Sequence, residues 1–194
     1  MIDFLKSKIE SSIHLKQKLN ENSEILSATE KIIESIVTCY RNGGKVFFCG
    51  NGGSAADAQH LAAELSGRFY YDRPPLFAEA LHVNTSYVTA VANDYSYDEI
   101  YSRYIAGAGN KGDVLIGLST SGNSGNVIKA LQKANEIGMI TVAFTGESGG
   151  KMKQHAQLLV NIPSTDTPRI QECHMLLGHS ICEMVEQTIF PKKY

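Results

Sequence analysis

The sequence predicts an α/β protein, a doubly wound three-layer α/β/α sandwich around a five-stranded parallel sheet, with extra helices at the N-terminus. Two observations carry this prediction. Short, almost continuously apolar segments alternate with longer stretches of helical periodicity, which is the pattern of a parallel sheet covered on both faces. The first forty-odd residues, by contrast, have helical periodicity alone. The chain has 194 residues, a length that favours one domain, so residues 1–194 are expected to form a single domain.

Two helices are predicted before the first strand. The first runs to Leu19, and its apolar residues recur at near-helical spacing at Ile2, Leu5, Ile9 and Ile13. The second runs from Leu26 to Tyr40 and ends at a pair of glycines, as a helix C-terminus often does. Because one α/β layer does not need both helices, their apolar stripe favours subunit packing over a cofactor site. Residues 1–43 are therefore expected to contact other subunits, and residues 44–194 to form the sandwich.

The elements of the sandwich are predicted in chain order. The strands are expected at Lys45–Cys49, Ala78–Val83, Asp113–Leu118, Met139–Thr145 and Leu158–Ile162. The helices are expected at Ser54–Leu65, Thr85–Ala92, Asp98–Ala106, Gly125–Ile137 and Thr167–Phe190. Ligands of such sheets bind outside the carboxyl ends of the strands, so the loops after the strands are the candidate sites.

Composition and charge exclude several functional classes. The chain has 18 Lys and Arg against 20 Asp and Glu, and its pI is about 6.3, so it lacks the basic excess of a nucleic-acid-binding domain. Charged residues interrupt each apolar stretch of the N-terminal segment, which predicts neither a signal peptide nor a membrane anchor. The four cysteines have no CxxC spacing and are too sparse for a disulfide scaffold. The sequence thus predicts a reduced, cytoplasmic protein without a nucleic-acid or membrane partner.

Two polar loops follow predicted strands and open helices. The loop Gly50–Ser54 is neither a GxGxxG motif nor a Walker loop, but its three glycines allow a ligand to approach the backbone closely. A tight strand-to-helix turn is the alternative. The loop Ser119–Ser124 has four hydroxyls at a helix N-terminus, which suits a phosphate monoester bound by hydroxyls, backbone N–H groups and the helix dipole. Ordinary N-capping, the alternative there, needs only one hydroxyl.

Four separated segments carry a family resemblance: CGNGGSAADAQHLAAELSGR, ANDYSYDEI, DVLIGLSTSGNS and RIQECHMLLGH. In order and spacing, from about Lys45 to His179, they resemble the sugar isomerase (SIS) family and, within it, the phosphoheptose isomerases. The resemblance implies a homotetramer with active sites where subunits meet. It also implies conversion of sedoheptulose 7-phosphate to D-glycero-D-manno-heptose 7-phosphate through an enediol, the first step toward the ADP- or GDP-heptose of surface glycans.

Such an isomerase needs a base at carbon, an acid/base for the sugar oxygens and an anchor for the phosphate. His60 and Glu64 are four residues apart on a predicted helix and share one face, which by itself indicates a surface pair. Gln171 and His179 are eight residues apart, about 80° around their helix, and can face one pocket. The resemblance implies that Glu64 is the general base and His179 the second acid/base group.

The resemblance further implies one zinc ion per subunit, with the ligands His60, Glu64, Gln171 and His179. Two imidazoles with carboxylate and amide oxygens suit zinc acting as a Lewis acid. Because a carboxylate bound to zinc is a weaker base, an essential and an auxiliary metal both remain open. The expected substrate contacts are Asn51, Gly52, Gly53, Glu64, Asn93, Asp94, Ser119, Thr120, Ser121, Ser124 and Gln171. A simple turn is the alternative for Asn93–Asp94, and Arg68 could neutralise phosphate or only flank a helix end.

Two other functional classes share this fold. The segments Leu81–Asn84 and Thr188–Pro191 depart from the usual isomerase pattern, and Thr188–Pro191 is more similar to a non-enzymatic branch that binds the replication initiator DnaA. That branch lacks the residues matching Glu64 and His179, which this chain has. A sugar-phosphate-sensing regulatory domain keeps the phosphate loop but also has no need of the acid/base pair. The isomerase is therefore the expected function, and His174 is expected in the core or an interface.

Overall fold

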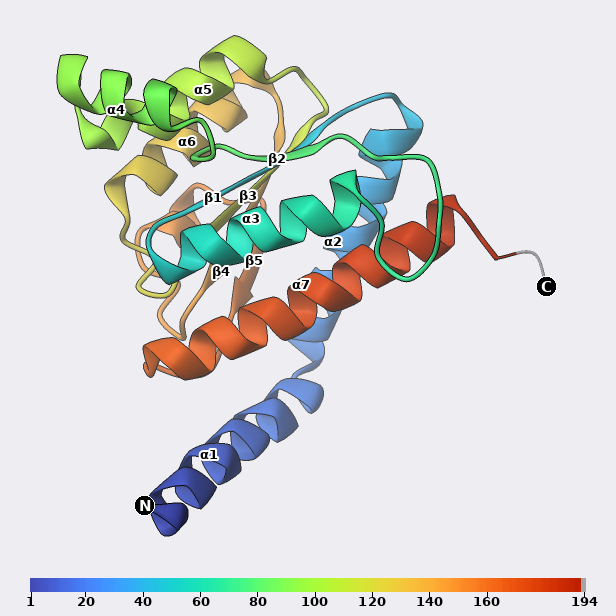
Figure 1. Cartoon of the computed structure of the whole chain (residues 1–194), viewed down its shortest axis with the longest axis vertical. Helices are drawn as coiled ribbons and strands as arrows, with labels where there is room; N and C mark the ends of the chain where they lie inside the picture. Colours follow the sequence, from blue (N-terminus) through green and yellow to red (C-terminus); the bar gives the residue numbers. More distant parts are fainter. Residues whose placement is uncertain (193–194) are drawn as a thin grey trace.

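The computed structural model describes residues 1–192 and contains the predicted five-stranded parallel sheet with helices on both faces (Figure 1). The strands are β1 (Val46–Gly50), β2 (Ala78–Ala80), β3 (Val114–Ser119), β4 (Ile140–Thr145) and β5 (Leu158–Asn161). Their order across the sheet is β2-β1-β3-β4-β5, and all four neighbouring pairs are parallel. This confirms the α/β fold class. The chain changes direction across the sheet between β1 and β3, so the loops after these strands lie at the topological switch point.

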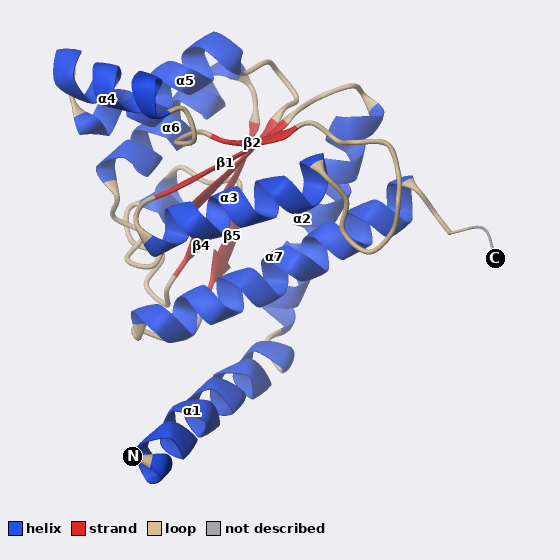
Figure 2. Ribbon diagram, viewed as in Figure 1, coloured by secondary structure: helices blue, strands red, loops and turns tan. Residues whose placement is uncertain are grey.

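Two helical layers enclose the sheet (Figure 2). One layer consists of α1 (Ile2–Asn20), α2 (Ser23–Arg41), α3 (Gly53–Ser66) and α7 (Thr167–Ile189). The other consists of α4 (Thr85–Asp94), α5 (Ile100–Ala108) and α6 (Gly125–Ile137), with the short 3₁₀ turns η1 (Tyr97–Glu99) and η2 (Met152–Gln154). No helix among residues 1–192 is both long and apolar enough to cross a membrane.

The central strands are buried along their whole length. Phe48 and Ile116 pack in the core beneath α2, α3 and α7, whereas Phe47 and Leu115 pack beneath α5 and α6. Every residue of β1 and β3 is buried. Since both faces are covered, these strands are apolar up to their carboxyl ends, which is why they form nearly continuous apolar runs in the sequence.

Helix α1 extends away from the rest of the chain (Figure 1). Only Leu15 and Leu19 of this helix are buried. Its second half is held to α7, where the Ser12 hydroxyl donates a hydrogen bond to Glu172 at 2.7 Å. The apolar residues that precede Leu15 are exposed: Ile2, Phe4, Leu5, Ile9 and Ile13.

The second strand is shorter than predicted. β2 ends at Ala80 rather than Val83, because the chain turns there to begin α4. The Val83 N–H bonds to the Ala80 carbonyl at 3.3 Å, and the Asn84 side chain caps α4 by accepting the Tyr87 N–H at 3.0 Å. The turn closed by the Val83–Ala80 bond therefore ends the strand, and three residues separate it from the N-cap of α4.

Candidate active site

The two polar loops lie side by side at the switch point, joined by a pair of amide hydrogen bonds. Asn51 and Asn126 each donate from Nδ2 to the other's Oδ1, both at 2.8 Å. Tyr97 adds a bond from its hydroxyl to Asn51 Oδ1 at 3.1 Å. The loop after β1 is thereby fixed to the first turn of α6. Sequence reasoning missed Asn126. Its only signal was an amide side chain on the face of the helix whose other residues are apolar.

The hydroxyls of the second loop converge at the start of α6. Ser119 Oγ lies 2.9 Å from Ser124 Oγ and 3.4 Å from Ser121 Oγ. Ser124 is the N-cap residue of α6 but makes no side-chain capping bond, so N-capping does not account for these hydroxyls. Thr120 holds the loop to the turn after β4, because its carbonyl accepts the Gly146 N–H at 3.0 Å. An anion at this point would meet hydroxyl donors and the positive end of a helix dipole.

A second polar cluster lies on the solvent side of α3 and α7. His60 Nε2 is 2.9 Å from Glu64 Oε1 and 3.3 Å from His179 Nε2. One candidate ligand atom from each of these three residues lies within 4.8 Å of the other two. The side chain of His60 is 51% exposed and that of Glu64 23%, so the cluster opens to solvent. His60 and Glu64 are therefore more than an isolated surface pair, since a side chain from another helix joins them.

The close crossing of α3 and α7 brings these side chains together. Gly178 immediately precedes His179, and a Cβ at Gly178 would lie 2.6 Å from the terminal carbons of Leu61. Since Gly178 carries no side chain, α7 can lie directly against α3. The Phe69 ring, on the turn after α3, also lies beside His179, with ring centroids 5.8 Å apart.

The donor set of this cluster fits a divalent metal such as zinc. A tetrahedral zinc ion bonded at about 2.0–2.1 Å to two imidazole nitrogens would hold them roughly 3.3 Å apart. This is the separation of the two Nε2 atoms of His60 and His179. The carboxylate of Glu64 lies beside them as a third donor.

Gln171 connects this cluster to the loop after β1. It precedes His179 by two turns of α7 and lines a groove with Asp57 and His179. Its Nε2 would lie 2.5 Å from a Cβ at Gly53, so a glycine at this position lets α7 approach the start of α3. Asp57 was not predicted. Burial raises its pKa, an effect partly offset by His60, and its Oδ2 has no hydrogen-bond partner among the described residues.

The remaining predicted contacts lie at the ends of helices. Gly52 is the N-cap residue of α3. Asn93 and Asp94 form the end of α4 rather than a turn, and both are exposed. Within residues 1–192, their side chains hydrogen-bond only to each other, from Asn93 Nδ2 to Asp94 Oδ1 at 3.0 Å. The structure thus joins the two loops and the α3–α7 cluster, but leaves these two side chains outside that network.

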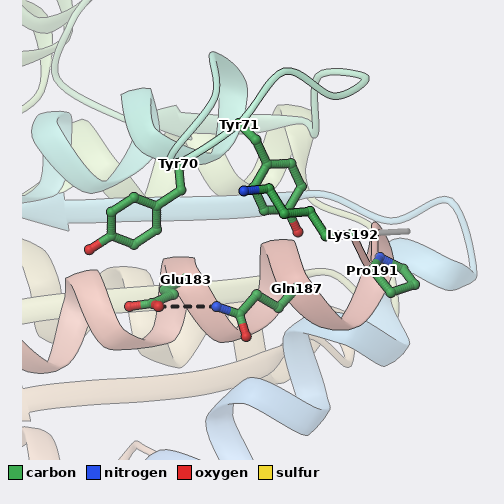
Figure 3. A pocket seen from close by; sticks show the side chains of 6 residues that line it. All are labelled: Tyr70, Tyr71, Glu183, Gln187, Pro191 and Lys192. Atoms are coloured by element: carbon green, nitrogen blue, oxygen red, sulfur yellow. Dashed lines mark hydrogen bonds between the residues drawn. The ribbon is translucent and has the colours of Figure 1, made fainter. Parts of the chain in front are cut away.

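A hollow next to the histidine cluster is lined by Tyr70, Tyr71, Glu183, Gln187, Pro191 and Lys192. Figure 3 shows Tyr70 and Tyr71 on the loop after α3, which lies along α7. On α7, Gln187 donates to Glu183 at 3.0 Å (Figure 3). Glu183 is one turn beyond His179, so this hollow continues the α3–α7 surface past the cluster.

Comparisons with known proteins identify the family. The SIS domain model matches residues 10–146. The phosphoheptose isomerase of Aneurinibacillus thermoaerophilus is 47% identical over 194 residues, which are 100% of this chain and 98% of that protein. That of Mycobacterium tuberculosis is 50% identical over 179 residues, with 92% and 91% covered.

Solved structures agree with this result. The phosphoheptose isomerase of Neisseria gonorrhoeae has a TM-score of 0.89 at 41% identity, with 95% of this chain and 98% of that chain covered. That of Francisella tularensis has a TM-score of 0.91 at 36% identity, with 96% and 98% covered. The chain therefore belongs to the SIS family and, within it, to the phosphoheptose isomerases, which are aldose–ketose isomerases acting on sugar phosphates.

Proposed function

We propose that the protein converts sedoheptulose 7-phosphate to D-glycero-D-manno-heptose 7-phosphate, the first step of ADP- or GDP-heptose synthesis for surface glycans. The observation that carries this proposal is the joint presence of a hydroxyl loop at the α6 N-terminus and an acid/base cluster on α3 and α7. An open-chain heptose 7-phosphate carries its phosphate and its carbonyl at opposite ends, so the anchor and the acid/base pair must be separated. The hydroxyl loop lies between β3 and α6, whereas His60 and Glu64 lie on α3 and His179 on α7, so the two groups are on different elements.

In this mechanism the proton transfers balance without a net gain or loss. Glu64 takes a proton from C1 of the ketose and returns it to C2, passing through the enediol. His179 gives a proton to O2 and takes one from O1, which leaves the aldose. The phosphate is held by Ser119, Thr120, Ser121 and Ser124. The sugar contacts are Asn51, Gly52, Gly53, Asn93, Asp94 and Gln171.

We further infer that each subunit holds one zinc ion through His60, Glu64, Gln171 and His179. The clustering of three of these donors within 4.8 Å supports the inference. When bound, zinc would supply Lewis acidity that polarises the carbonyl and hydroxyl of the sugar. Glu64 would then be a weaker base, because its charge is shared with the metal.

The assembly that we propose is a homotetramer in the cytoplasm. Its support is the row of exposed apolar residues on α1, which a neighbouring subunit would cover. All four cysteines are buried and unpaired, which accords with a reducing compartment.

Incubation of the protein with sedoheptulose 7-phosphate, followed by NMR, tests the proposed reaction. We expect the anomeric signals of the aldose to appear with multiple turnovers per subunit. Fructose 6-phosphate and ribulose 5-phosphate serve as shorter ketose phosphates for comparison. A protein that turned over none of them but bound DnaA would belong with the non-enzymatic relatives, and the proposal would be wrong.

A further inference from the structure

A buried arginine caps the end of α3. Arg73 lies on the loop after α3, and its side chain is 1% exposed. Its guanidinium donates to the Glu64 carbonyl at 2.9 Å and to the Leu65 carbonyl at 2.8 Å. It also donates to the carbonyls of Gly67 at 3.2 Å and Pro74 at 3.1 Å. The last carbonyls of a helix have no partner within the helix, so here one side chain satisfies them and its charge also favours the helix dipole.

A buried glutamate of α7 holds this arginine in place. The side chain of Glu186 is 0% exposed, and its Oε1 accepts the Arg73 Nε–H at 3.0 Å. Glu186 also accepts the backbone N–H groups of Phe69 at 2.9 Å and Tyr70 at 2.8 Å. Burial alone would raise the pKa of Glu186, but the two backbone donors and the Arg73 guanidinium together lower it. Glu186 is therefore a buried carboxylate whose charge is balanced by Arg73 and whose oxygens both accept hydrogen bonds.

The pair connects the two helices that carry the proposed acid/base groups. At the end of α3, the Arg73 guanidinium donates to the backbone carbonyl of Glu64 itself. On α7, Glu186 lies seven residues beyond His179, on the same helix face and about 10 Å along the axis. The turn that Glu186 holds carries Phe69, whose ring packs against the His179 imidazole. Neither Arg73 nor Glu186 contacts the carboxylate of Glu64 or the imidazole of His179 by a hydrogen bond among residues 1–192.

We propose that Arg73 and Glu186 are positioning residues of the isomerase, which set the distance and orientation between Glu64 on α3 and His179 on α7. The inference rests on the roles proposed for Glu64 and His179. A displacement of about 1 Å between reacting groups can cost on the order of 100-fold in rate. An effect on kcat is expected, because the acid/base groups move. The Michaelis constant is expected to change little, because the phosphate loop lies on β3 and α6.

The chain offers a matched control for this test in Asp113. Like Glu186, Asp113 is a buried carboxylate that accepts two backbone N–H groups, from Lys45 at 2.8 Å and Asn110 at 2.9 Å. It also pairs with a cation, the Lys45 ammonium at 3.7 Å. Asp113 lies just before β3, at the opposite end of the sheet from the loops. Asp113→Asn and Glu186→Gln therefore remove the same kind of interaction at two places.

The experiment measures kcat and KM of both variants with sedoheptulose 7-phosphate, at a temperature where circular dichroism shows both to be folded. We expect Glu186→Gln to lower kcat by about 10- to 100-fold with KM within about threefold of the parent. Asp113→Asn should leave both constants within about twofold. If Glu186→Gln does not fold, the same measurement is made on Arg73→Lys. Lysine keeps the charge but cannot donate to two carbonyls and a carboxylate at once. Equal effects of the two substitutions on kcat would overturn the inference.

A further measurement does not depend on activity. In protein labelled with ¹³C at the histidine rings, we expect Glu186→Gln to shift the resonances of His60 and His179, while those of His14 and His155 stay in place. Asp113→Asn should shift neither pair. Unshifted His60 and His179 resonances in Glu186→Gln would contradict the positioning role even if the substrate were misassigned. Full activity of Glu64→Gln, by contrast, would contradict the proposed role of Glu64 as general base. The shifts of the His60 and His179 resonances would then remain as the test of the positioning role of Arg73 and Glu186.

Discussion

Burial fixes the protonation state of His174. The side chain is 0% exposed in the core, beside the Phe144 ring, and its Nε2 lies 3.1 Å from the Thr145 carbonyl. Burial lowers the pKa of His174 to about 4, although the bond to Thr145 acts in the opposite direction. The imidazole is therefore neutral in the folded protein near neutral pH. Its place in the core agrees with the prediction from the sequence.

This histidine predicts a loss of stability in mild acid. The unfolded chain binds a proton at His174 with a pKa near 6.5, and the folded chain binds it only near 4. The contribution of neutral His174 to the free energy of unfolding is fully present above pH 6.5. It is lost as the pH drops toward 4, by about 3 kcal/mol in total. Urea unfolding at pH 7 and pH 5 checks this against His174→Gln, which can still donate to Thr145. We expect a smaller pH dependence in the variant, and equal dependence in the two proteins would contradict the assignment.

The hydroxyl loop predicts a change in substrate affinity. Replacement of Ser119, Thr120 and Ser124 together by Ala removes hydroxyl donors, each worth roughly 1.5–3 kcal/mol when the acceptor is charged. We expect KM for the sugar phosphate to rise by at least 100-fold. Ser35→Ala is the control, because that hydroxyl donates to the Lys31 carbonyl within α2, far from the loop in the chain. A triple variant with the parent's KM would show that the phosphate binds elsewhere.

The metal inference predicts that zinc content and activity change together. His60→Ala removes one of the three clustered donors and should lower the zinc retained after dialysis, measured by elemental analysis. Treatment of the parent protein with a chelator should have the same effect on turnover. His155→Ala, a histidine outside the cluster, should retain zinc as the parent does. A parent protein that is fully active without metal would contradict the zinc role and spare the isomerase.

At the scale of the elements, periodicity predicted almost every helix and strand. The strands of the core, such as β3 and β4, were clear because both of their faces are buried. The predicted end of β2 was wrong because a turn, closed by the bond from the Val83 N–H to the Ala80 carbonyl, follows Ala80 directly, and the apolar run of the sequence continues through that turn. The end of α3 depends on Arg73, seven residues beyond the helix, and on Glu186 more than a hundred residues away. Contacts of that range leave no local pattern.

Helix α1 predicts the behaviour of the assembly. Because Ile9 and Ile13 are exposed on the single chain, replacing both with Asp should leave the core intact. In the proposed tetramer the same change would bury two charges, which is costly. We expect light scattering to report a smaller mass for this variant, whereas Lys6→Asp on the same helix should keep the parent's mass. A double variant that assembles like the parent would show that α1 is not in the interface.

At the scale of the whole molecule, the candidate site combines segments from three helices, α3, α6 and α7, and two loops. The residue types, such as the hydroxyls of Ser119–Ser124 and the pair His60 and Glu64, could be selected from the sequence and its family resemblance. Their relation in space could not, because it depends on the crossing of α3 and α7 at Gly178 and on the Asn51–Asn126 bonds. The metal ligands, substrate contacts and catalytic roles stay predictions until they are measured.

The most direct test of the account is the turnover of sedoheptulose 7-phosphate by Glu64→Gln and His179→Asn. Both substitutions keep a polar group but remove its ability to exchange a proton near neutral pH, and Glu183→Gln, one turn beyond His179, is the control. General acid–base groups contribute roughly 10²- to 10⁴-fold, so each variant should lose at least about 100-fold in kcat, while the control keeps the parent's rate. The two losses should not add fully, since both groups serve one proton transfer. Turnover within a few-fold of the parent in both variants would contradict the acid/base assignment.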